Sequence, residues 1–204
     1  MSGVKSRREQ YSEATRAALL ETATALFAER GFAGTALEDV ASATQVTRGA
    51  VYHHFAGKRD LFEAVLADLE MRAMERIATA AASATDAWES ALLGLDAFLE
   101  QCSEPVYGRL VWQEGPVALG WRRWKECEEK YAYGLTEQFV RSLMASGYIE
   151  PTAPEVTVRF VFALLGAIGS LLADAGRAEK PRVRAECAVL IRRMLGGLRP
   201  PDAS

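Results

Sequence analysis

The amino-acid sequence predicts an all-α protein of about nine helices. Half of its 204 residues are hydrophobic and a quarter are charged, as in ordinary globular domains. Apolar residues recur at helical spacing, no proline occurs before Pro105, and the sequence has no sustained strand-like alternation. We expect an N-terminal three-helix domain at 1–57, with a flexible arm at 1–11, and a larger helical domain at 58–204.

Capping residues set the ends of the first three helices. The first helix is predicted at 12–30, with Gly31 as its terminating residue. The second begins after Thr35, because Thr35 and Glu38 have the spacing of a capping box, and it ends near residue 43. After a tight turn, the third helix has Thr47 as its N-cap and runs to about residue 54.

Prolines and glycines divide the rest of the chain. Pro105, Pro154 and Pro181 suit the first turns of helices. Breaks are expected at Gly115-Pro116, Gly147 and Gly176. The predicted helices span 58–82, 86–101, 105–113, 117–145, 154–175 and 182–197.

The two short helices between Thr35 and Lys58 have the spacing of a helix-turn-helix, whose second helix can lie in a DNA major groove. The exposed side of this second helix presents Arg48, Gly49, Tyr52 and His53. An arginine can pair with a guanine edge, glycine permits close backbone approach, and tyrosine can bond phosphates. A generic helical hairpin with solvated polar residues gives the same pattern.

The segment VTRGAVYHHFAGKRDLF at 46–62 resembles the recognition-helix signature of the TetR family of bacterial transcriptional repressors. The resemblance covers about residues 13–62 and implies a homodimer that binds a palindromic operator and a small effector. It places Arg48 and Gly49 at base edges. It places the following residues at or near backbone phosphates: Thr35, Thr47, Tyr52, His53 and Lys58.

Two positions depart from the family pattern. The turn residue, usually glycine, is Gln45, which costs roughly 1 kcal/mol if its φ is positive. His53 stands where the family often has tryptophan. Because neighbouring helical side chains diverge by about 100°, His53 and His54 do not predict a metal site, and His54 is expected to pack between the first and fourth helices.

The predicted arm carries Lys5, Arg7 and Arg8. Such a segment is either a solubilising tail or a basic arm that reaches a minor groove or phosphates.

An aromatic-rich stretch predicts an effector cavity in the larger domain, since ligand sites are apolar with a few polar groups. The same aromatic residues could instead form only core. The expected lining residues are Phe98, Trp112, Trp121, Trp124, Tyr131 and Phe139, with Arg109, Gln113 and Glu114 as polar contacts. The expected effector is small and apolar or aromatic.

The segment 160–173 is uncharged and apolar nearly all round, but it is shorter than the roughly 20 residues of a membrane span. It predicts either a dimer interface in a shared four-helix bundle or packing within one chain. The interface candidates are Phe160, Leu164, Gly166, Ala167, Gly169, Ser170, Leu171 and Ile191.

Motifs of several other classes are absent from the sequence, including GxSxG, the P-loop and the dinucleotide fingerprint. Cys102, Cys127 and Cys187 lie far apart and form no CxxC, so no metal or cofactor is expected. We predict a cytoplasmic, ligand-responsive regulator that is not an enzyme, has no membrane partner and acts as a repressor. An activator of the same family and a helical adaptor without DNA binding are the alternatives.

Overall fold

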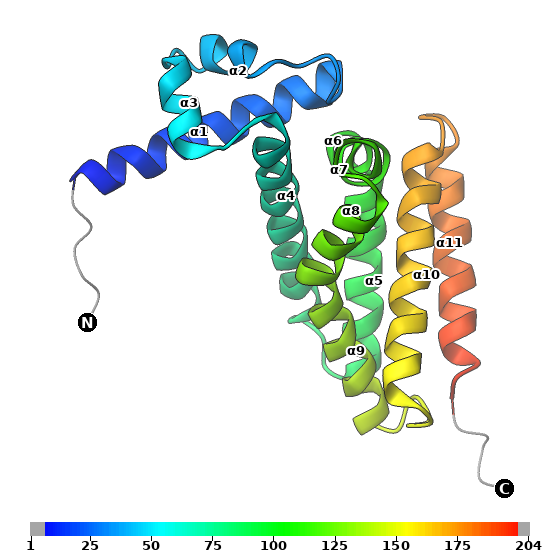
Figure 1. Cartoon of the computed structure of the whole chain (residues 1–204). Coiled ribbons are helices and arrows are strands. Elements are labelled where there is room, and N and C mark those ends of the chain that lie inside the picture. Colours follow the sequence, from blue (N-terminus) through cyan, green and yellow to red (C-terminus); the bar gives the residue numbers. More distant parts are fainter. Residues whose placement is uncertain (1–6, 200–204) are drawn as a thin grey trace, which may run out of the picture.

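The computed structural model describes residues 7–199, and all regular elements in this range are helical, as predicted (Figure 1). Counted as uninterrupted helical segments, the described chain has nine, which matches the prediction. The elements are α1 (Arg7–Arg30), α2 (Leu37–Ala43), α3 (Arg48–His54), α4 (Lys58–Ala81), α5 (Ala87–Ser103), α6 (Pro105–Tyr107), η1 (Gly108–Glu114), α7 (Gly115–Leu119), α8 (Trp121–Glu128), η2 (Glu129–Tyr133), α9 (Gly134–Ala145), α10 (Pro154–Asp174) and α11 (Lys180–Gly196); η1 and η2 are π-helical.

Helices α1–α3 form a small domain at one end of the molecule, joined to a larger bundle through α4 (Figure 1). The core that they share with α4 includes Phe27 of α1 and Phe62 of α4, whose rings meet edge to face at 5.0 Å. The first helix begins at Arg7 rather than at residue 12, so residues 7–11 are helical and not part of a flexible arm. Lys5 lies outside the described residues.

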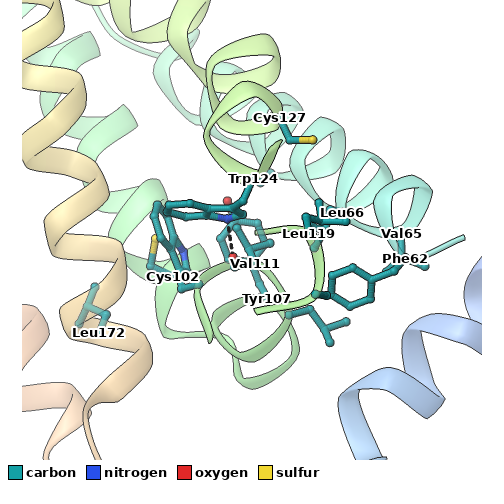
Figure 2. Packing of buried hydrophobic residues seen from close by; sticks show 14 of the residues in the cluster. Phe62, Val65, Leu66, Cys102, Tyr107, Val111, Leu119, Trp124, Cys127 and Leu172 are labelled. Atoms are coloured by element: carbon teal, nitrogen blue, oxygen red, sulfur yellow. Dashed lines mark hydrogen bonds between the residues drawn. The ribbon is translucent and has the colours of Figure 1, made fainter. Parts of the chain in front are cut away.

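The predicted helices 105–113 and 117–145 were divided at the wrong place. Residues 105–119 run continuously through α6, η1 and α7, and the chain breaks at Gly120, whose φ is +80°. Gly115 lies within the helical segment and does not end it. Its lack of a side chain makes room for a neighbouring ring, since a Cβ there would lie 2.7 Å from Cδ1 of Trp124. The Trp124 indole N–H donates to the Val111 carbonyl at 2.8 Å, which ties α8 to η1 (Figure 2).

Helices α10 and α11 lie side by side at the edge of the bundle farthest from α4 (Figure 1). By length and composition alone, α10 is apolar enough to cross a membrane, and only 28% of its most apolar window is buried. Its exposed apolar residues gather on one face, which is described below together with the outer face of α11.

Candidate nucleic-acid interface and ligand cavity

The turn between α2 and α3 has the geometry of a helix-turn-helix. Thr47 is the N-cap of α3, and its hydroxyl accepts the Ala50 N–H at 3.2 Å, as the sequence predicted. Gln45 has φ +58°, the left-handed conformation that explains why glycine is the usual residue at this position. Val40 and Val51 are fully buried between the two helices, which fixes the angle at which α3 is presented.

The outer face of α3 is polar and open to solvent. Arg48, Gly49, Tyr52 and His53 are all exposed. The Arg48 guanidinium lies 3.4 Å from the Tyr52 hydroxyl, 5.4 Å from the centre of its ring and 3.2 Å from a carboxylate oxygen of Glu38. The hydrogen bond to Tyr52 and the charge of Glu38 raise the pKa of Arg48, so this side chain is a permanent cation.

Thr35 does not lie on this surface. Its side chain is buried, with 2% of the residue exposed, and its hydroxyl donates to the Gly31 carbonyl at 2.9 Å. The N-cap of α2 is Ala36, whose N–H is bound by the Asp39 carboxylate at 2.9 Å, so the predicted Thr35–Glu38 capping box is wrong. Thr35 therefore holds the loop in place and is not available for a phosphate contact.

Lys58 begins α4 and closes a groove beside α3. Its ammonium donates to the Phe32 carbonyl at 2.8 Å and lies 4.4 Å from the centre of the Phe32 ring. The groove is lined by residues 33–39, by Tyr52 and by residues 56–58. Lys58 thus has an internal role, and it also stands with Tyr52 in one open groove on the α3 side of the molecule.

The two histidines have different surroundings. His53 is exposed, whereas His54 is half-buried, and burial together with the charges of His53 and Arg16 lowers the pKa of His54. Their rings lie 5.1 Å apart and are steeply inclined, at 71°. Within residues 7–199, no group of three or more His, Cys, Asp or Glu side chains is placed to hold a metal ion.

A cavity of about 90 Å³ lies inside the larger domain, lined by α4, α5, α9, α10 and α11 and by residues of α6, η1, α8 and η2. Of the predicted lining residues, Phe98, Trp112 and Phe139 line it. The other three do not. Trp121 is 66% exposed, Trp124 is buried against η1, and Tyr131 lies outside the cavity wall.

Sequence reasoning missed the polar residues of this cavity, Glu70, Tyr107, Glu128 and Thr136. Glu70 is 4% exposed and accepts a hydrogen bond from the Tyr107 hydroxyl at 3.2 Å. Burial raises the pKa of Glu70 to about 8, and the charge of Glu128 contributes to that rise. The sequence position of Glu70 could have indicated its burial, because Glu70 falls on the apolar stripe of α4 with Leu66, Ala73 and Ile77.

The expected polar contacts Arg109, Gln113 and Glu114 face away from the cavity. Arg109 donates to the carbonyl of Ala28 at 2.6 Å, near the C-terminal end of α1. Glu114 accepts the Phe32 N–H at 3.0 Å, and Gln113 donates to the Ala173 carbonyl at 2.9 Å. The η1 segment therefore has Trp112 on the cavity side and two contacts with the end of α1 on the other.

The outer faces of α10 and α11 carry an apolar stripe. Phe160, Ala167 and Leu171 are exposed on α10, at spacings of seven and four residues that place them on one face. Leu164 and Ser170 are half-buried beside them, and Val189 and Leu190 continue the exposed surface on α11. Three predicted interface residues face their own chain instead: Gly166 lines the cavity, Gly169 packs on Trp112, and Ile191 is 1% exposed.

Comparisons with known proteins identify both parts of the chain. Residues 19–65 match the family model for bacterial regulatory proteins of the tetR family. Residues 88–198, more than half of the chain, match the model for the tetracyclin repressor-like C-terminal domain. Both models describe transcriptional regulators and not enzymes.

Individual relatives agree with these models. The Transposon Tn10 TetC protein of Escherichia coli is 21% identical over 72% of this chain and 74% of its own length. The transcriptional repressor KstR2 of Mycobacterium tuberculosis is 43% identical, over 25% of this chain and 26% of its own. A crystal structure of a TetR-family regulator from Pectobacterium atrosepticum matches with a TM-score of 0.81 and 27% identity, over 97% of this chain and 99% of that one. The chain therefore belongs to the TetR family of ligand-responsive bacterial transcriptional regulators.

Proposed function

We propose that this protein is a cytoplasmic repressor that binds a palindromic DNA site as a homodimer and leaves it when a small molecule enters the cavity. The exposed face of α3 carries this proposal. It combines a permanent cation, a glycine and a tyrosine on a capped helix whose orientation is fixed by the buried core of α1–α4. Relatives named as repressors favour repression over activation.

Arg48 and Gly49 stand in the first turn of α3, where a recognition helix approaches base edges. For Arg48 to bond a guanine edge, it must leave Glu38, and this exposed ion pair costs little to break. Thr47, Tyr52, His53 and Lys58 surround this turn and are assigned to phosphates. Thr35 is left out of the assignment because its hydroxyl is buried and bonded to Gly31.

The homodimer is assigned to the apolar stripe on α10 and α11. A stripe that includes Phe160, Leu171 and Leu190, each more than half exposed, is stabilised by removal from water. The same face on two copies meets around a two-fold axis and gives a four-helix bundle. Such a dimer presents two α3 helices to successive major grooves, which are about 34–36 Å apart.

Communication between cavity and DNA is assigned to η1. This segment places Trp112 in the cavity wall, while Arg109 and Glu114 hold the end of α1 and the backbone of Phe32. Lys58, at the start of α4, binds the carbonyl of the same Phe32. A ligand that displaces η1 therefore acts on the loop that leads into α2. The ligand must bind the DNA-incompetent arrangement more tightly, since only differential affinity shifts an equilibrium.

Selection of bound duplexes from a random pool tests this function and identifies the operator in one experiment. The proposal expects enrichment of an inverted repeat whose half-sites are separated by about one helical turn or a multiple of it. Binding to the enriched duplex should weaken steeply as salt rises, because phosphate contacts release counterions. Failure to enrich any sequence, together with no salt-dependent binding, would favour the adaptor alternative.

A further inference from the structure

The ionisable groups of the cavity gather at one end. Glu70, Met74 and Ile77 line it from α4 over seven residues, which is about 10 Å of helix. The antiparallel helix α5 places Phe98 near Glu70 and Ala91 near Ile77, as the bond from Ser90 Oγ to the Ala81 carbonyl at the far end indicates. Glu70, Tyr107 and Glu128 thus lie at one end of a narrow apolar channel.

The two carboxyl groups at this end differ in their partners. Glu128 is paired with Lys125, whose ammonium lies 2.8 Å from its carboxylate oxygen. Between residues 7 and 199, no Lys or Arg forms an ion pair with Glu70, which bonds to the Tyr107 hydroxyl. An ionised Glu70 is therefore a buried charge without a counterion, and such a charge is strongly destabilising.

Trp112 stands in the same wall. Its indole N–H is buried without an oxygen or nitrogen acceptor in the described part of the chain, and the group on which it acts is the Cys102 thiol, which does not line the cavity. An indole N–H can only donate, and a protonated amine can only donate, so Trp112 contributes the face of its ring to this end of the cavity and not its N–H. The remaining walls are aliphatic and aromatic except for Thr136, whose hydroxyl donates to the Ala132 carbonyl at 3.2 Å.

We infer that the effector is a slender apolar molecule with a protonated amine at one end, which lies against Glu70 with its apolar chain directed toward Ile77. This inference rests on the proposed effector role of the cavity. The amine supplies the missing counterion of Glu70, and the rings of Tyr107 and Trp112 offer faces that attract a cation. A ligand carboxylate at the same end would instead favour the protonated form of Glu70, so its binding should expel no proton and should weaken as pH rises.

The titration of Glu70 gives the inference a pH signature. Burial raises the pKa of Glu70 to about 8, so its carboxyl group is mostly protonated at pH 7 when no cation lies beside it. The titratable groups that face it are Tyr107 and Cys102, whose pKa values are also raised by burial, and the Lys125-paired Glu128. A cation selects the ionised form, so amine binding expels a proton and strengthens as pH rises toward 8.

Calorimetry with n-octylamine, n-octanol and octanoate tests the inference, because the three share one chain and differ in charge. For octylamine, we expect the tightest binding, an affinity that rises about tenfold per unit between pH 6 and 7.5, and release of one proton. Octanol should bind more weakly and without that pH dependence. Equal affinity for octylamine and octanol, or no octylamine binding, would overturn the inference.

Glu70→Gln keeps the size and the Tyr107 partner of this side chain and removes its charge. We expect it to abolish the preference for octylamine over octanol, while Glu75→Gln, an exposed change on the same helix, preserves it. If the Glu70→Gln variant does not fold, the inference is tested by the wild type, which should release one proton when it binds octylamine and none when it binds octanol. If octylamine binds but the protein stays on DNA, only the effector role of the cavity is contradicted. If octanol releases DNA and octylamine does not, only the assignment of an amine to the effector is contradicted.

Discussion

The carboxylate of Glu114 accepts the backbone N–H of Phe32 at 3.0 Å, and this contact joins a wall of the cavity to the loop that leads into α2. The two residues are 82 positions apart in the chain. Gly31 makes the approach possible, since a Cβ at that residue would lie 2.7 Å from a carboxylate oxygen of Glu114. Its φ of +74° is itself a glycine conformation.

Glu114→Ala should weaken the link between cavity and DNA. The Phe32 amide loses its partner, so its hydrogen exchange should accelerate, and the free energy of unfolding should fall by about 1 kcal/mol. The ratio of DNA dissociation constants with and without saturating octylamine should move toward one. Gln113→Ala, which removes the neighbouring contact to α10, is the control. A wild-type ratio in Glu114→Ala would exclude this contact as the route of communication.

Leu171→Glu should dissociate the dimer. The side chain is 58% exposed in one protomer, so its replacement leaves the fold intact but places a charge in the proposed apolar interface. Sedimentation at micromolar concentration should give twice 22.3 kDa for the wild type and one protomer for the variant. Val117→Glu, at an 81% exposed position on α7, should remain dimeric. A wild type that is monomeric and still binds a palindrome tightly would contradict the assignment.

Gly169→Ala should destabilise the fold and not the interface. A Cβ at Gly169 would clash with the six-membered ring of Trp112, which forces the cavity wall to move. Overpacking of this kind costs roughly 1–3 kcal/mol of unfolding free energy. Gly134→Ala, where nothing lies within 4 Å, should be neutral or slightly stabilising. Equal stability of the two variants in urea titrations would show that Trp112 is not held against α10 as described.

The free energy of unfolding should depend on pH through Glu70. Its pKa is about 8 in the folded protein and near 4.5 when unfolded, so the folded state binds the proton more tightly between these values. Stability should therefore fall as pH rises from about 5 to 8, by at most about 1.4 kcal/mol per unit from this group. Glu70→Gln should flatten that decline in urea titrations. An unchanged pH slope in the variant would mean that Glu70 is not buried without a counterion.

Local signals explain why the helix-turn-helix was predictable. Thr47 caps α3 through its own side chain, and the turn residue Gln45 has the positive φ that its departure from glycine implied. The capping box failed because Thr35 has a stronger alternative in Gly31 and Leu26, carbonyls that tertiary packing brings to it. Asp39, one residue beyond the predicted partner, bonds the N-cap instead.

The cavity was less predictable because its residues depend on how helices pack. Trp124 and Trp112 are both buried aromatics, but only the packing of α8 on η1 sends the first into the core and the second into the cavity wall. The sequence predicted a helix break at Gly115, but its lack of a side chain leaves room for the ring of Trp124 instead. The pattern of small residues placed Gly166 and Gly169 among the candidates for the dimer interface, although both lie on the inner face of α10.

The most direct test of the central claim, that α3 reads DNA, is a titration of Arg48→Ala and Lys58→Ala against operator and scrambled duplexes at several salt concentrations. Arg48→Ala should reduce discrimination at particular base pairs by roughly 5- to 150-fold per half-site. Lys58→Ala should weaken both duplexes together and make the log–log salt slope shallower by about 1.8 in the dimer. If Arg48→Ala leaves sequence preference intact and weakens every duplex equally, α3 does not read bases through Arg48 and the account is contradicted.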